Sequence, residues 1–213
     1  MDTYAVLTGD IVKSREISPR ARLIRTLKEA LAIASQAHRA DYEIYRGDSF
    51  QMVIPSPSAA ALVAIVIRSK LLSQSAKKSS PWDARISVGI GGITYRGEKT
   101  TESDGPAFLL SGQGMDELNK TNRRLIVKAP WDAADRSLSL VTRFADDIVS
   151  NWSRYSAETA FLNLVYEESQ NALAKRLGKS QSTINDRIAT AKLELIRAYV
   201  QHVKDYVNWE TRA

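Results

Sequence analysis

The sequence predicts an α+β protein in which a sheet with helices on one face is followed by an all-α segment. In the first part, short stretches of alternating or β-branched apolar residues are interleaved with stretches whose apolar residues recur at helical spacing. From Trp131 onward only the helical pattern remains. We therefore expect two domains, residues 1–130 and residues 131–213, the second opening with a linker helix.

The first five elements each have a local signal. The apolar run Thr3–Leu7 predicts a buried strand. Ser18-Pro19, followed by apolar residues at helical spacing, predicts a helix over 19–38. Two alternating arms joined by a Gly-Asp turn predict a hairpin over 42–54, and a helix over 59–76 follows it.

Three further elements complete the sheet domain. Alternation predicts a long strand over 85–95, and the glycines inside it indicate a bulge or the close approach of another group: Gly89, Gly91 and Gly92. A helix begins near Pro106, and a short strand covers 124–128. The order β-α-β-β-α-β-α-β is the ferredoxin-like split βαβ plan with additions.

The composition excludes several classes of site. The chain has 213 residues and no cysteine, so disulfides, iron–sulfur clusters and cysteine nucleophiles are excluded, and with only two histidines a His-rich metal centre is excluded as well. The N-terminus lacks a signal-peptide pattern, and the longest apolar run, Ala59–Ile67, is far shorter than the roughly 18 residues of a membrane span. We therefore expect a cytoplasmic protein with no membrane partner. The net charge of +6 permits nucleic-acid binding without demonstrating it.

Two aspartates are predicted to meet at one edge of the sheet. Asp10 follows the first strand, and Asp48 lies in the turn of the hairpin. In a ferredoxin-like sheet the first two strands run parallel, so the end of the first lies beside that turn. Two close carboxylates need a cation or a proton between them, and carboxylate oxygens suit Mg²⁺. The alternative is that Gly-Asp is ordinary turn chemistry in both places.

Residues 170–189 have the pattern of a helix-turn-helix. Ala174 is small where two helices would cross, Gly178 suits the turn, and Ser180 would cap the second helix. The polar side chains expected to face DNA, together with lysines beside the turn, are Gln181, Ser182, Thr183, Asn185, Arg187, Lys175 and Lys179. The alternative is a plain helical hairpin that packs on the first domain or forms a dimer.

Four segments in the same order carry a family resemblance: Tyr4–Arg15, Tyr45–Val53, Arg85–Ile93 and Ser103–Leu118. Through them residues 1–128 resemble the catalytic domain of class III nucleotidyl cyclases. The whole chain resembles the small bacterial SatD-like proteins, which join such a domain to a helical DNA-binding tail. The resemblance implies that Asp10 and Asp48 are the two metal-binding aspartates, with Mg²⁺ or Mn²⁺ and a nucleotide as ligands.

Other positions depart from the cyclase pattern. Ile44 stands where active cyclases place a base-recognising lysine, although Glu102 keeps the acidic residue expected before the late helix. Leu109 and Gln113 stand at the asparagine and transition-state arginine positions. Leucine cannot hydrogen-bond a ribose, and glutamine cannot supply a cation to a transferring phosphoryl group. The metal pair is therefore expected without the full chemical machinery.

These observations predict a homodimeric, DNA-binding transcriptional regulator whose first domain senses a nucleotide or mediates dimerisation. Lys13 and Arg15, just beyond Asp10, and Glu102 are the candidate nucleotide-binding residues. Two alternatives stay open. One is a metal-dependent nucleotidyl cyclase or related phosphoryl-transfer enzyme, and the other is a non-catalytic assembly module with no DNA role.

Overall fold

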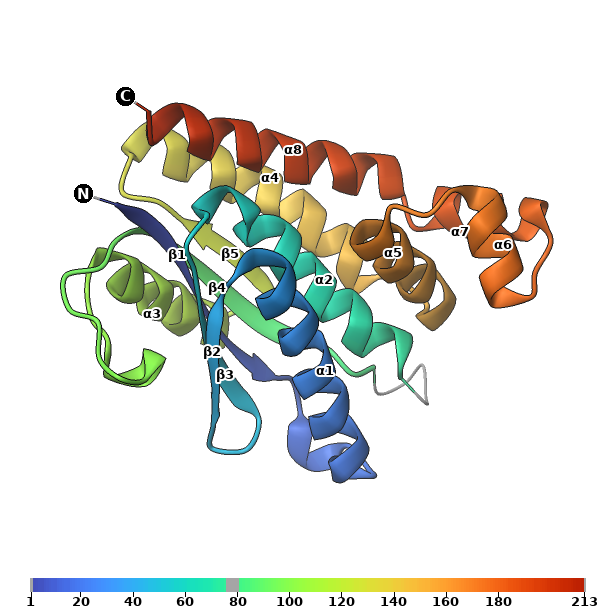
Figure 1. The fold of residues 1–213 in the computed structure, drawn as a ribbon, viewed down its shortest axis with the longest axis horizontal. Coiled ribbons are helices and arrows are strands. Elements are labelled where there is room, and N and C mark those ends of the chain that lie inside the picture. Colours follow the sequence, from blue (N-terminus) through green and yellow to red (C-terminus); the bar gives the residue numbers. More distant parts are fainter. Residues whose placement is uncertain (1, 76–80, 213) are drawn as a thin grey trace.

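A five-stranded sheet lies at the centre of the molecule (Figure 1). The computed structural model describes residues 2–75 and 81–212. The strand order is β2-β3-β1-β4-β5, and every neighbouring pair is antiparallel except β4 and β5. The strands are β1 (Thr3–Ile11), β2 (Asp41–Tyr45), β3 (Ser49–Ile54), β4 (Ala84–Gly92) and β5 (Leu125–Lys128).

Eight α-helices surround and extend this sheet within the described residues. They are α1 (Arg20–His38), α2 (Ala60–Ser73), α3 (Pro106–Asn119), α4 (Asp132–Ser150), α5 (Arg154–Tyr166), α6 (Gln170–Leu177), α7 (Gln181–Thr190) and α8 (Leu193–Glu210). The predicted order of strands and helices is confirmed up to β5, as is the helix over 131–150. Residue 76, the predicted end of the second helix, lies outside the described residues; α2 ends at Ser73. The fourth strand is shorter than predicted, because it ends at Gly92 and Tyr95 pairs separately with Asp104.

The expectation of helices on one face only is wrong, because helices cover both faces. Side chains such as Leu7 and Val88 on one face belong to the large core that also contains residues of α1 and α2. On the other face, Val6 and Val53 pack against Ala107 of α3. The sequence of α3 gives no indication of which face it covers.

Two glycines of β4 allow α3 to lie directly on the sheet. A Cβ built at Gly89 would stand 2.2 Å from the carbonyl oxygen of Ala107, and one at Gly91 would stand 3.0 Å from the Ala107 nitrogen. No real side chain fits at Gly89 without displacing the α3 backbone. The predicted close approach of another group to this strand is therefore confirmed, and that group is α3.

The C-terminal helices share the core of the sheet. Leu138 and Val149 of α4, and Ile196 and Val203 of α8, belong to the same hydrophobic cluster as the strands. Figure 1 shows α4 and α8 side by side above the sheet, with α6 and α7 projecting beyond α5. The proposed division at residue 130 remains a prediction about chain organisation, and the packing is continuous across it.

A buried ionic network ties α4 to the sheet. Arg68 of α2 is fully buried and donates to Asp83 at 2.8 and 2.9 Å and to Asp146 of α4 at 2.7 Å. The backbone nitrogen of Arg124, just before β5, also donates to Asp146, at 2.8 Å. Burial alone would lower the pKa of Arg68, but the two carboxylates outweigh it and raise that pKa above its ordinary value. The charge is therefore retained inside the core.

Candidate functional site at the carboxyl end of β1

The end of β1 and the turn between β2 and β3 lie side by side. In the antiparallel pairing of β1 with β3, Asp10 stands opposite Ser49. The backbone nitrogen of Ile11 donates to the carbonyl oxygen of Asp48 at 3.1 Å. The structure thus brings Asp10 and Asp48 together as the strand order predicts, and we refer to this pair as the acidic edge.

The acidic edge already contains a cation, the guanidinium of Arg85 on β4. Asp10 and Arg85 are paired across the sheet, and Nε and Nη2 of Arg85 donate to the two carboxylate oxygens of Asp10 at 2.9 and 2.7 Å. Both side chains are about a quarter exposed, at 23% for Asp10 and 27% for Arg85. A bidentate arginine pair uses the same oxygens that a metal ion would use. Arg85 was not among the residues predicted for this site.

Asp48 has a separate partner. The hydroxyl of Ser14 donates to its carboxylate, from the 3₁₀ turn Ser14–Glu16 that follows β1. Ser14 is buried, although the lysine before it is exposed. The two aspartates therefore have different surroundings, and only Asp10 is neutralised by a positive charge among the contacts of the described residues.

The hard carboxylate oxygens of Asp10, on β1, and Asp48, in the turn between β2 and β3, are of the chemical type that binds Mg²⁺ or Mn²⁺. In the arrangement described, however, both oxygens of Asp10 are occupied by Arg85. No group of three or more His, Asp or Glu side chains placed to hold a metal exists among residues 2–75 and 81–212. The donor set therefore fits a divalent cation in kind, and such a cation would compete with Arg85 for the oxygens of Asp10. The metal role of Asp10 and Asp48 stays a prediction.

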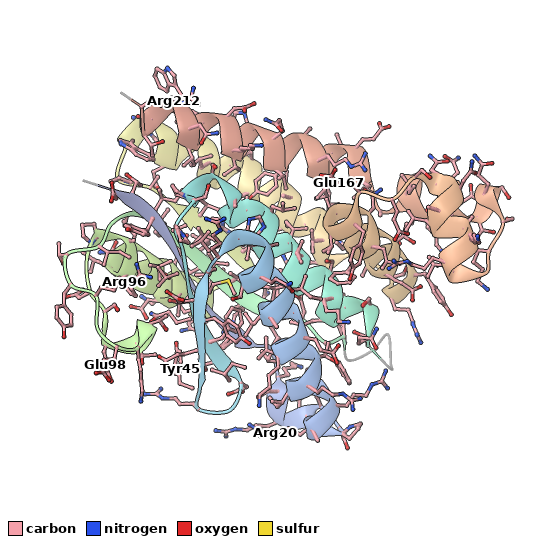
Figure 2. The ribbon with its side chains drawn as sticks, viewed as in Figure 1. Arg20, Tyr45, Arg96, Glu98, Glu167 and Arg212 are labelled. Carbon is pink, nitrogen blue, oxygen red and sulfur yellow. The ribbon has the colours of Figure 1, made fainter. Side chains whose placement is uncertain are left out.

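Basic residues surround the acidic edge. Lys13 and Arg15 are exposed, and Lys13 lies 3.8 Å from Glu16. The guanidinium of Arg20, at the start of α1, would lie 3.3 Å from a Cβ at Gly47 in the hairpin turn. Figure 2 shows Arg20 and Tyr45 at the same end of the molecule. Anionic groups such as phosphates would meet several cations there, which leaves Lys13 and Arg15 as candidate nucleotide contacts.

The third candidate nucleotide contact, Glu102, lies elsewhere on the sheet. It belongs to the 3₁₀ turn Thr100–Glu102, whose two threonines donate to Glu43 of β2. These hydrogen bonds lower the pKa of Glu43. Glu102 is exposed, and no contact among the described residues joins it to either aspartate. The structure therefore gives no support for placing Glu102 with Asp10 and Asp48.

The helix pair α6–α7 has the local geometry that the sequence predicts. Gly178 adopts a left-handed conformation with φ of 60° at the end of α6, and the Lys179 nitrogen donates back to the Ala174 carbonyl at 3.0 Å. The Ser180 hydroxyl accepts from the Thr183 nitrogen and caps α7. Leu173 and Ala174 pack against Ile184 in a small cluster of their own.

Most of the residues predicted to face DNA are exposed on this pair. The exposed ones are Lys175, Lys179, Gln181, Ser182 and Asn185. Thr183 is partly buried, and its hydroxyl is 2.9 Å from that of Ser180. Lys175 lies on the last turn of α6, and the other positions lie in the turn between the helices or on the first two turns of α7.

The outward orientation predicted for Arg187 is wrong. Its side chain is only 13% exposed and pairs with Glu158 of α5 at 3.3 Å. The guanidinium also lies over the ring of Tyr155, 4.7 Å from the centroid. Arg187 therefore attaches α7 to α5, and its charge is already compensated. The partner residues are 29 or more positions away in sequence, so no local pattern indicates this contact.

No helix among the described residues is long and apolar enough to cross a membrane. Comparison with solved structures finds distant likenesses, including two cyclase structures with TM-scores below 0.5. A bacterial light-regulated adenylyl cyclase is 14% identical with a TM-score of 0.45, over 59% of this chain and 75% of that one. The active GGEEF domain of a diguanylate cyclase from Vibrio cholerae is 11% identical with a TM-score of 0.44, over 62% and 85%.

No curated protein matches the sequence. The model of the SatD family matches residues 4–206, which is nearly the whole chain and includes both the sheet and the C-terminal helices. The chain belongs to the SatD family.

Proposed function

We propose that this protein is a DNA-binding regulator in which α7 contacts base edges and the acidic edge responds to a nucleotide. The observation that carries the proposal is the polar surface of α6–α7. Gln181, Ser182 and Asn185 are exposed on α7, while the helix itself is held from behind by Ile184 and Arg187. A helix whose apolar side is fixed and whose first turns present short polar side chains suits the major groove.

Two lysines would add contacts to the DNA backbone. Lys175 is on the last turn of α6, and Lys179 is in the turn between the helices. Both side chains are exposed, and Figure 1 shows α6 and α7 projecting beyond α5. Contacts of this kind contribute affinity that falls steeply with salt.

A chain of contacts connects the acidic edge to the base of α7. The Val12 nitrogen donates to the Asp83 carbonyl at 2.9 Å, and Asp83 is bound through Arg68 to Asp146 of α4. Beyond α4, the indole nitrogen of Trp152 donates to the Ala191 carbonyl, between α7 and α8, at 2.8 Å. A ligand that displaced Arg85 or Ser14 would act on the first of these contacts, so its binding would be coupled to the position of α7.

The test is a gel shift at moderate salt with the DNA fragment that the wild-type protein selects from a random pool, because base contacts contribute only where the sequence fits. The variant Gln181→Ala/Asn185→Ala should lose at least tenfold in affinity, because each base contact contributes about 1–3 kcal/mol. Gln36→Ala/Gln113→Ala removes two exposed polar side chains from α1 and α3 and should bind like the wild type. If the wild type does not bind any fragment, or the two double variants bind equally, α6–α7 is a structural hairpin.

A second candidate is metal-dependent phosphoryl transfer, which is favoured by the meeting of Asp10 and Asp48. With Arg85 displaced, these carboxylates would hold a divalent cation, which neutralises phosphate charge. Leu109 and Gln113 are exposed on α3, and neither side chain can supply a cation to a phosphoryl group. The test is to incubate the protein with a panel of nucleoside triphosphates and Mg²⁺ or Mn²⁺ and to measure product. Product that disappears in Asp48→Ala would support the enzyme, and no product from any triphosphate would reject it.

A further inference from the structure

An exposed apolar surface lies on α4 and α8. Eight large apolar side chains are exposed among the described residues, and four of them are on these two helices: Leu140 at 53%, Phe144 at 64%, Leu195 at 58% and Trp209 at 66%. Two of the other four, Tyr155 and Tyr166, are partly covered by arginine side chains that lie over their rings. Isolated apolar residues need no explanation, but a contiguous group of them indicates an interaction surface.

A groove runs along this surface between the two helices. It has a volume of about 520 Å³ and is lined on α4 by Val141, Ala145 and Ile148 and on α8 by Leu195, Ala198 and Tyr199. Phe144 stands beside it. At one end, the lining includes the oppositely charged Asp147 and Lys192. The floor is fixed, because the hydroxyls of Thr142 and Tyr199 are 3.1 Å apart and both residues are buried.

We propose that this surface, which we call the α4–α8 face, pairs with the same face of a second copy of the chain. The charge on its two helices is the first argument. Arg143 is exposed on the outer side of α4, one turn before the exposed Asp147, and Glu194 and Asp205 are exposed on α8. A two-fold rotation that places α4 over the partner's α8 brings the basic Arg143 to these acidic side chains.

The directions of the helices agree with this pairing. Figure 1 shows α4 and α8 running in opposite directions along each other. A rotation about an axis parallel to them gives a four-helix bundle in which each α4 is antiparallel to both α8 helices, the usual arrangement of such bundles. Phe144 of each copy then lies over the groove of the other, where the small side chains of Ala145 and Ala198 leave space.

The size of the surface predicts moderate affinity. α8 has 18 residues and is therefore about 27 Å long, and two adjacent helices are about 20 Å wide. The α4–α8 face thus offers about 500 Å² per copy, or about 1,000 Å² in a pair, which is near the lower limit for a specific interface. We expect a dimer that dissociates in the micromolar range.

This inference deepens the proposed function, because a dimer would present two copies of α7 to DNA, but the pairing itself is measured without DNA. Analytical ultracentrifugation of the full chain, from about 1 to 200 µM, should show a monomer–dimer equilibrium. Phe144→Asp and Leu195→Asp should each weaken it at least tenfold. Leu109→Asp makes the same change at an equally exposed position on α3 and should leave it unchanged.

The charges on α4 and α8 provide a second measurement. Arg143→Glu should weaken the dimer, and adding Asp205→Lys should restore it, because the two opposite charges are then exchanged between α4 and the partner's α8. Circular dichroism and the unfolding midpoint verify that each variant is folded. A wild type that is monomeric throughout the range overturns the proposal, as does a dimer that survives both aspartate variants or one that Leu109→Asp disrupts. A failure of DNA binding in a chain that still dimerises would reject the proposed function alone.

Discussion

The acidic edge of the sheet and the α6–α7 pair are both polar regions, but they differ in how far their side chains are already paired with other residues. At the acidic edge the charged groups are bound to one another, with Asp10 on Arg85 and Asp48 on Ser14. On α7 the side chains of Gln181 and Asn185 are exposed, and Ser182 is exposed although its hydroxyl lies 2.9 Å from that of Ser180. A ligand at α7 would therefore meet exposed side chains, whereas a ligand at the acidic edge would compete with contacts that are already made.

The largest expected loss of stability comes from breaking the buried ionic network of Arg68, Asp83 and Asp146, which lies between the two regions. Arg68→Ala would leave Asp83 and Asp146 buried without their counter-ion, and breaking a buried pair in this way costs about 3–5 kcal/mol of stability. Urea unfolding measures it, with Arg143→Ala as an exposed control on α4. A loss below about 1 kcal/mol, the range of surface pairs, would show that the network does not hold α4 to the sheet.

A smaller effect is expected in the turn of α6–α7. Gly178 has φ of +60°, and no atom lies within 4 Å of a Cβ built there, so Gly178→Ala adds backbone strain without a clash. We expect a loss of about 1–2 kcal/mol, confined to α6 and α7, because left-handed backbone is unfavourable for residues with a Cβ. Hydrogen exchange should show faster exchange in these helices only. Equal changes in α1 and α2 would mean that the pair does not open separately from the core.

A loss of about 1 kcal/mol in the free energy of unfolding, measured with urea, is expected when the acidic edge loses a charge. Asp10→Asn removes the negative charge but keeps the shape of the side chain. Arg85 then loses its charged partner at a partly exposed site. The converse variant, Arg85→Gln, frees both oxygens of Asp10, and we expect it to bind Mn²⁺ several-fold more tightly than the wild type in calorimetric titrations. The addition of Asp48→Asn should reverse that gain. If Arg85→Gln binds Mn²⁺ no better, Arg85 does not compete with a metal at this edge.

The smallest expected loss of stability is at Arg187. This variant distinguishes a residue that holds α7 in place from the residues of α7 that are proposed to contact DNA. Arg187→Ala removes a half-buried ion pair with Glu158, and the expected loss of stability is about 0.5–1 kcal/mol. DNA affinity should fall much less than in Gln181→Ala/Asn185→Ala. A larger loss of DNA affinity in Arg187→Ala than in that double variant would mean that the guanidinium leaves Tyr155 and Glu158 to contact DNA.

The sequence by itself determined the features that depend on neighbouring residues. The order of the elements up to β5 follows from apolar periodicity, and the left-handed Gly178 and the capping Ser180 follow from turn and helix-cap chemistry. The meeting of Asp10 and Asp48 was also predictable, because it requires only the strand order.

Only the tertiary structure decided which distant side chains pair. The partners of Asp10, Arg68 and Arg187 depend on strand register and on which helix face meets which neighbour. The same holds for α3, whose place on the second face of the sheet depends on the space above Gly89. Periodicity shows that a side chain is polar or apolar, but a charged residue finds its partner through packing across the whole chain. For that reason the local pattern identified α7 but placed Arg187 on the wrong side of it.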